Sequence, residues 1–164
     1  MPLLGIEAEI AFRFDRDLPP RAEEYRRDEV AAAVTALASI EIVASRFRSY
    51  RDTPLLDRAA DCMSNGAFVT GTLQPDWRSI DLTALEATLA INGAVTIRKR
   101  GEHPAVDPIL PTIALVNELR AAPGVRAGQI ITTGICTGMH FGRPGDLVTA
   151  SFTDFGTAEI HLTV

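Results

Sequence analysis

Alternation of apolar and polar side chains predicts a protein built mostly from β-strands. Residues 5–14 give the clearest example, because every second side chain is apolar there. One face of this predicted strand carries Ile6, Ala8, Ile10, Phe12 and Phe14. Glu7 and Glu9 lie on the opposite face with Ala11 and Arg13. The pattern is typical of a strand that packs one face against a core.

Further strand-like runs follow along the whole chain. They are expected at residues 40–47, 67–73, 87–91, 95–97, 129–133, 146–152 and 158–164. Asn92-Gly93 separates two of these runs, and both residues tolerate the positive φ of a type I′ turn, which predicts a tight hairpin. The last two runs are expected to form a second hairpin around Asp154 to Gly156.

Two segments show helical spacing instead. Over residues 28–38, Val30, Val34 and Leu37 recur at the helical period, which predicts a helix. A second helix is expected to begin at Asp107-Pro108 and to end before Pro123-Gly124. Its apolar stripe is Ile109, Ile113, Val116 and Leu119. With a short helix expected within residues 51–65, the pattern predicts an α+β fold with a mostly antiparallel β core and two or three helices.

Composition narrows the class of protein. The 164 residues are 46% hydrophobic and carry a formal net charge of −5, so a globular core is expected and a nucleic-acid partner is not. No linker or repeat divides the chain, so residues 1–164 are expected to form a single domain. Cys62 and Cys136 are 74 residues apart and no apolar run could span a bilayer. We therefore expect a cytoplasmic protein with no membrane partner.

The pair Glu7 and Glu9 is the first candidate for chemistry. Side chains two residues apart on a strand share a face, so the two carboxylates lie side by side. Such a pair repels unless it is solvated, protonated or bridged by a cation. A solvated outer face of the strand and a metal site are both consistent with the pair alone.

Glu41 is the second candidate, because it interrupts a run that is apolar on both faces. A buried carboxylate needs a partner, which would be either a metal ion or an arginine such as Arg46 or Arg48. Three carboxylates suit a hard cation such as Mg²⁺ or Mn²⁺. The residues by themselves leave the two interpretations open.

Several segments resemble the fumarylacetoacetate hydrolase superfamily. Residues 5–12 (G-I-E-A-E-I-A-F) are similar to its G-x-E-x-E-x-A-F signature. Residues 40–47 (I-E-I-V-A-S-R-F) and 60–69 (A-D-C-M-S-N-G-A-F-V) resemble segments of its branch of 2-oxopent-4-enoate hydratases and 4-oxalocrotonate decarboxylases. Later landmarks at residues 92–93, 127–131 and 133–138 follow in the same order. The resemblance therefore covers essentially the whole chain.

The resemblance implies a fold, a cofactor and an activity. The fold would be the mixed, barrel-like β roll of the family's C-terminal catalytic domain. Glu7, Glu9 and Glu41 would bind Mg²⁺ or Mn²⁺, and a 2-oxo acid would chelate that metal. The activity would be hydration of 2-hydroxy-2,4-dienoate or 2-oxo-4-enoate acids from aromatic catabolism. The alternative within the branch is decarboxylation of 2-oxo-3-enedioate (4-oxalocrotonate).

Three further residues are candidates for the substrate pocket. The resemblance favours Thr137, in a glycine-rich loop that could otherwise be a plain connection between strands. Asp61 and Ser64 are expected either to line the same pocket or to cap a turn. No residue is assigned as the catalytic acid or base.

The chain also departs from the family pattern. It begins at the predicted first strand, whereas family members carry a preceding segment that supplies a lysine and an acid, and Cys62 stands where the branch usually has asparagine. A truncated, non-catalytic metal-binding scaffold is therefore the hypothesis from another class. The resemblance further implies a homo-oligomer, a dimer or larger, and a possible pairing of hydratase with decarboxylase.

Overall fold

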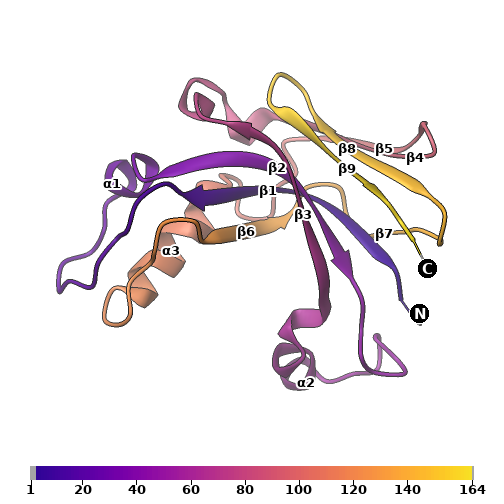
Figure 1. Cartoon of the computed structure of the whole chain (residues 1–164), viewed down its shortest axis with the longest axis horizontal. Helices are drawn as coiled ribbons and strands as arrows, with labels where there is room; N and C mark the ends of the chain where they lie inside the picture. The colour runs from indigo at the N-terminus through magenta and orange to yellow at the C-terminus, as the bar shows by residue number, and fades with distance from the viewer. Residues whose placement is uncertain (1–2, 164) are drawn as a thin grey trace.

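The computed structural model describes residues 3–163 and contains two antiparallel β-sheets (Figure 1). The first sheet has the order β3-β2-β1-β6, with β7 also paired to β1. Its strands are β1 (Gly5–Phe14), β2 (Val34–Val43), β3 (Asn65–Gln74), β6 (Ile130–Ile135) and β7 (His140–Phe141). The second sheet has the order β5-β4-β8-β9. Its strands are β4 (Glu86–Ile91), β5 (Ala94–Arg100), β8 (Leu147–Phe152) and β9 (Gly156–His161).

Three α-helices accompany the sheets. The helix α1 (Arg27–Ala31) leads into β2, α2 (Leu55–Ala60) connects β2 to β3, and α3 (Ile109–Leu119) leads back to β6. Figure 1 shows α1 and α3 at one end of the first sheet, and α2 projecting from its other end. No residue of α2 is buried, so this short helix adds nothing to the core. None of the helices within residues 3–163 is long and apolar enough to cross a membrane.

The core lies between the two sheets, against the apolar face of β1. That face is fully buried, as its alternating pattern predicts, and Phe12 contacts Trp77 edge to face with ring centroids 5.1 Å apart. The second sheet contributes Leu89, Val148, Ala150 and Phe152. The opposite face of β1 is covered as well at its centre, where Glu9 is only 2% exposed.

The two sheets approach each other closely where β3 passes β9. A Cβ at Gly71 would collide with the backbone of Thr157 and Ala158, so only glycine fits there. The Thr72 hydroxyl donates to the Thr157 carbonyl oxygen at 3.1 Å. The described residues form no backbone ladder between β3 and β9, so side-chain contacts join the two sheets at this edge. The α+β class is confirmed, and the roll is open, with every ladder antiparallel.

The helix predicted over residues 28–38 is wrong in its second half. The helix α1 ends at Ala31, and Val34 to Leu37 already belong to β2. This central strand is buried on both faces, so it presents a nearly continuous apolar run. Such a run contains helical spacings by accident, which is why Val34 and Leu37 matched the helical period. The strand predicted over residues 40–47 likewise ends earlier, at Val43.

The strand predicted over residues 158–164 is β9, which spans Gly156–His161, and residue 164 lies outside the described residues. The Asn-Gly hairpin and the second helix are confirmed. Asn92 and Gly93 both have positive φ, 52° and 79°, as the type I′ turn between β4 and β5 requires. The helix α3 follows Pro108, and Asp107 accepts a hydrogen bond from the Ile109 amide at 3.3 Å. Ile109 and Val116 of its stripe are buried in the core.

Candidate metal centre

Three glutamates from two neighbouring strands converge on one face of the first sheet. Glu7 of β1 lies directly opposite Glu41 of β2, and Glu9 follows two residues along the same face. One carboxylate oxygen from each of the three can be chosen so that all lie within 4.8 Å of one another. The backbone register therefore brings together the three residues proposed as metal ligands.

No basic side chain of the described residues neutralises this cluster. Within residues 3–163, no lysine or arginine forms an ion pair with Glu7, Glu9 or Glu41. Of the two arginines considered for Glu41, Arg46 pairs with Asp61 at 3.1 Å, and Arg48 forms no ion pair with Glu41 among the described residues. The Oε2 atom of Glu9 is buried without a hydrogen-bond partner among the described residues. A buried oxygen left in this state marks a position for a ligand.

Burial and mutual repulsion change the acidity of two of these groups. Burial, followed by the charges of Glu41 and Glu7, raises the pKa of Glu9 to about 8, against smaller lowering effects of the Gly134 backbone and the Thr132 hydroxyl. Burial and the charge of Glu41 raise the pKa of Glu7 to about 7. A bound cation reverses this repulsion, because it stabilises the ionised form of each carboxylate. The cluster therefore fits a hard divalent cation with oxygen ligands.

Asn65 is a neighbour of the cluster that the sequence analysis did not single out. Its side-chain amide donates to Oε1 of Glu41 at 2.8 Å, which orients that carboxylate. Asn65 begins β3 and lies opposite Val43 at the end of β2. An amide before an apolar strand is a weak signal by itself, and only the register of β2 and β3 places it beside Glu41.

The structure places the three candidate pocket residues differently. The Thr137 hydroxyl is buried and accepts a 3.4 Å hydrogen bond from the Ala8 amide, which lies between Glu7 and Glu9 in the chain. The Ser64 side chain is buried beside Asn65, and its Oγ has no partner within the described residues. Asp61 is held by Arg46. Thr137 therefore contacts the backbone between Glu7 and Glu9, and Ser64 precedes the residue that bonds Glu41. Asp61 is instead engaged in an ion pair with Arg46.

The segment before β3 has an unusual backbone. Cys62, Met63 and Ser64 have φ values of 51°, 53° and 65°, so three consecutive residues adopt the left-handed region. The carbonyl oxygen of Ser64 accepts a hydrogen bond from the Ala44 amide at 2.8 Å, just past the end of β2. This bond continues the contact between β2 and the start of β3. The left-handed turn therefore delivers Ser64 and Asn65 to the end of β2 that carries Glu41.

Other reactive groups are engaged in structural contacts. Burial raises the pKa of the Cys136 thiol to about 12, which disfavours the thiolate needed for nucleophilic chemistry. Lys99 pairs with Glu102 at 2.6 Å on the surface. His103 is buried, with one ring nitrogen 3.2 Å from the Thr133 hydroxyl and the other accepting from the Ala105 amide. The three glutamates therefore remain the strongest candidate site.

Two hollows lie near the first sheet. One of about 620 Å³ lies against α1 and Trp77, and none of the three glutamates lines it. A smaller one of about 180 Å³ has Arg13, Leu37 and Leu73 in its walls. The larger hollow is thus remote from the carboxylates, while the smaller one is on their side of the sheet, since Arg13 shares the face of Glu7 and Glu9.

Comparisons with known proteins agree with this architecture. Residues 3–163 match the family model described as "Fumarylacetoacetate (FAA) hydrolase C-terminal". The chain is 36% identical over 130 residues to a 2-keto-4-pentenoate hydratase of Burkholderia vietnamiensis, covering 79% of this chain and 49% of that protein. It is 33% identical over 153 residues to a 2-keto-4-pentenoate hydratase of Paraburkholderia phymatum, covering 93% and 58%. The chain thus spans about half the length of these curated relatives.

A solved structure gives the same result for the fold. The 4-oxalocrotonate decarboxylase from Pseudomonas putida G7, complexed with magnesium and adipate, superposes with a TM-score of 0.79 at 25% identity. The match covers 96% of this chain and 60% of that structure. With a family model matched along nearly the entire chain and relatives more than 30% identical, the chain belongs to the fumarylacetoacetate hydrolase family, in the part of it that forms the C-terminal domain.

Proposed function

We propose that this chain is the metal-binding catalytic domain of a hydratase, which adds water to 2-hydroxy-2,4-dienoate or 2-oxo-4-enoate acids. The observation that carries the proposal is the cluster of Glu7, Glu9 and Glu41, whose oxygens meet within 4.8 Å with no basic partner among the described residues. The similarity of the chain to curated 2-keto-4-pentenoate hydratases supports the choice of reaction.

In this proposal the three glutamates hold Mg²⁺ or Mn²⁺. The cation, when bound, acts as a Lewis acid that stabilises the negative charge developing on a 2-oxo acid. Asn65 holds the Glu41 carboxylate in place through the 2.8 Å hydrogen bond. Thr137 fixes the backbone between Glu7 and Glu9 through the Ala8 amide. The burial of Glu9 excludes water from its side of the site, which strengthens every electrostatic interaction there.

Three pocket residues complete the proposal, with different amounts of support. Thr137 and Ser64 are buried next to groups that contact the glutamates, which supports a place in the pocket wall. Asp61 would have to exchange its ion pair with Arg46 for a contact with substrate. Its side chain is nevertheless only 8% exposed, so it faces the protein and not open solvent.

A metal titration tests the ligand set. Glu9→Gln keeps the shape of the side chain but removes its charge, and we expect Mn²⁺ affinity to fall at least about a hundredfold, since removing even an outer partner of a ligand costs 10- to 100-fold. Glu159→Gln, at an exposed position on β9, is the matched control and should leave the affinity unchanged. Equal affinity for the wild type and Glu9→Gln, measured by calorimetry, would overturn the ligand assignment.

The reaction requires a separate measurement. The hydratase predicts loss of dienoate absorbance that depends on added Mg²⁺ or Mn²⁺, without release of CO₂. The superposition on a decarboxylase structure favours a second candidate, decarboxylation of an unsaturated 2-oxo diacid, which predicts CO₂ release from the same metal centre. Metal binding without either reaction would identify the chain as a non-catalytic scaffold.

We also propose that copies of the chain associate and that they act in the cytoplasm. Leu55 and Leu56 of α2 are 60% and 82% exposed, and an apolar surface of this kind is typical of a protein interface. A homo-oligomer, a dimer or larger, would cover it, and light scattering on the purified chain measures the assembly. A mixed assembly of hydratase and decarboxylase would use the same surface. Both cysteines are free thiols, which fits a reducing compartment.

A further inference from the structure

The smaller hollow lies on the same face of the first sheet as the carboxylate cluster, although none of the three glutamates lines it. Its volume is about 180 Å³. Its walls are formed by Arg13, Leu37, Thr70, Gly71, Leu73 and Ile130. All six residues are on strands of the first sheet (β1, β2, β3 and β6), so the hollow lies across the sheet and does not depend on a loop.

The strand register shows how close the hollow comes to the cluster. Glu9, Ser39 and Thr70 form one row across β1, β2 and β3, so the hollow begins in the row of Glu9. The next row contains Leu37 opposite Leu73, which are walls of the hollow. Successive rows on one face are two residues, or about 6.8 Å, apart. The apolar walls are therefore one row away from the proposed metal ligand.

The far end of the hollow lies another row along, at Arg13 and Ile130, which are opposite each other on β1 and β6. The Arg13 guanidinium is already paired, because it donates to Asp15 Oδ1 at 3.3 Å. The other oxygen of Asp15 accepts from the Thr35 hydroxyl at 2.6 Å, which fixes this pair. The cation at the end of the hollow thus has an internal carboxylate partner and creates little demand for an acidic ligand.

The remaining walls offer apolar surface. Leu73 is 42% exposed and Ile130 is 38% exposed, on a sheet face where such side chains gain free energy by contacting a ligand. Leu37, between them, is buried and forms the floor. An apolar floor with a paired arginine at its end suits a hydrocarbon chain better than a second carboxylate.

We propose that this hollow binds the tail of the substrate, and that the chain prefers 2-oxo acids whose apolar chain extends beyond five carbons. The inference rests on the proposed function, because the glutamate cluster must first bind the 2-oxo acid end. A five-carbon acid held there ends near the row of Glu9. Each further methylene enters the row of Leu37 and Leu73.

The test is calorimetric binding of unreactive, saturated 2-oxo acids to the whole chain in the presence of Mg²⁺. We expect 2-oxooctanoate to bind about ten- to sixtyfold more tightly than 2-oxopentanoate, because it adds three methylenes and each fully buried methylene gives about fourfold. The diacid 2-oxoadipate should bind more weakly than 2-oxooctanoate. Tighter binding of the diacid, or equal binding of the five- and eight-carbon acids, would overturn the inference and leave the proposed function intact.

Two matched variants assign the effect to the hollow. Leu73→Ala should weaken 2-oxooctanoate binding about three- to tenfold while leaving 2-oxopentanoate unchanged. Leu147→Ala, on β8 of the other sheet, makes the same substitution at a similarly exposed side chain (39%) and should change neither. An equal effect of the two variants contradicts the tail subsite. If Mg²⁺ binds but neither acid does, the proposed function fails and the inference fails with it.

Discussion

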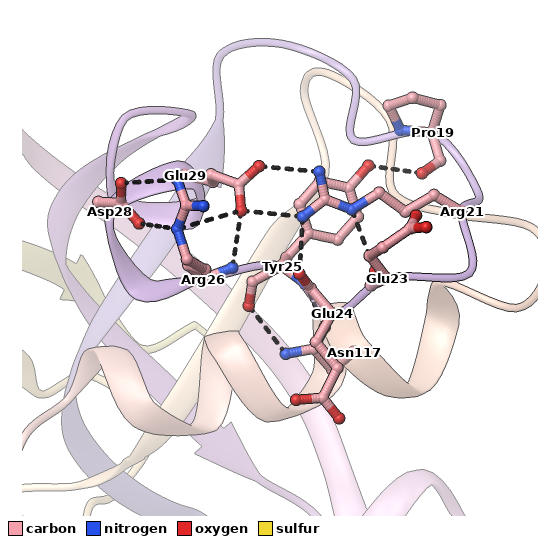
Figure 2. Close-up of polar contacts among 9 residues, drawn as sticks. All are labelled: Pro19, Arg21, Glu23, Glu24, Tyr25, Arg26, Asp28, Glu29 and Asn117. Carbon is pink, nitrogen blue, oxygen red and sulfur yellow. Dashed lines mark hydrogen bonds and ion pairs between the residues drawn. The ribbon is translucent and has the colours of Figure 1, made fainter.

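Glu29 and Glu9 are both held close to other charged groups, but those groups have opposite signs. Glu29, in α1, accepts two hydrogen bonds from the Arg21 guanidinium, at 2.8 and 2.9 Å, and a third from the Arg26 amide (Figure 2). These contacts lower the pKa of Glu29 to about 2. Glu9 lies beside Glu7 and Glu41 instead, and its pKa rises to about 8.

The arginine that pairs with Glu29 is itself held in place by further contacts. Arg21 lies over the ring of Tyr25, 3.6 Å from its centroid, and Asn117 of α3 exchanges two hydrogen bonds with the backbone of Tyr25. Figure 2 shows the Glu29 carboxylate between Arg21 and Arg26, so its charge is balanced by basic side chains of the same chain. The cluster of Glu7, Glu9 and Glu41 has no such basic partner among the described residues. Charged groups that are paired within the chain indicate a structural role, whereas a group of carboxylates that requires a cation indicates a ligand site.

The largest expected consequence of this difference is a fall in stability with rising pH in metal-free protein. The pKa values of Glu7 and Glu9 are raised by folding, so the folded state keeps protons that the unfolded state loses above about pH 4.5. Stability should therefore decrease between about pH 4.5 and 8, by at most about 5 kcal/mol for Glu9. Thermal unfolding in the presence of a chelator measures this.

Two changes should reduce that fall. Glu9→Gln removes the group with the larger rise in pKa, so its unfolding temperature should depend less on pH than that of the wild type. Mg²⁺ at a hundredfold excess over its Kd should add about 3 kcal/mol at pH 8. If the chelated wild type is equally stable at pH 5 and pH 8, the repulsion inferred for the cluster is contradicted.

A second, smaller effect should distinguish the two regions when one asparagine in each is replaced by alanine. Asn65→Ala removes the hydrogen bond that orients Glu41, and we expect Mn²⁺ affinity to fall about tenfold with little change in stability at pH 5. Asn117→Ala is the counterpart, because it leaves the Tyr25 amide without its partner. That variant should unfold at a lower temperature and bind Mn²⁺ as the wild type does. Loss of metal affinity in both variants would mean that the two regions are coupled.

The sequence pattern predicted one of the two strands that carry the cluster and misassigned part of the other. In β1 the residues that face the core alternate with acidic ones, so both its limits and the common face of Glu7 and Glu9 could be predicted. In β2 both faces are buried, so the period of two is lost and its first half matched a helix. Glu41 was still identifiable, because a charge within an apolar run is unusual.

What the pattern could not predict is the register between strands. The position of Asn65 beside Glu41 depends on how β3 pairs with β2, and that pairing contains two irregularities, one of them between Ile42 and Val43. The hollow next to the cluster likewise depends on a register shift, between Leu37 and Ser39. Long-range pairing is decided by packing of the whole sheet, and no local stretch of residues encodes it.

The smallest expected effect comes from Glu29, and its pH dependence should have the opposite sign. Folding lowers the pKa of Glu29 to about 2, so its contribution is complete above about pH 4.5 and is lost as the pH falls towards 2. Glu29→Gln should therefore lower the unfolding temperature by a few degrees at pH 6, and the difference from the wild type should shrink between pH 5 and pH 3. Circular dichroism during heating measures both values, and Mn²⁺ affinity should be unchanged. A difference that grows in acid would show that Arg21 does not stabilise the ionised carboxylate, and the contrast with Glu9 would then reflect burial alone.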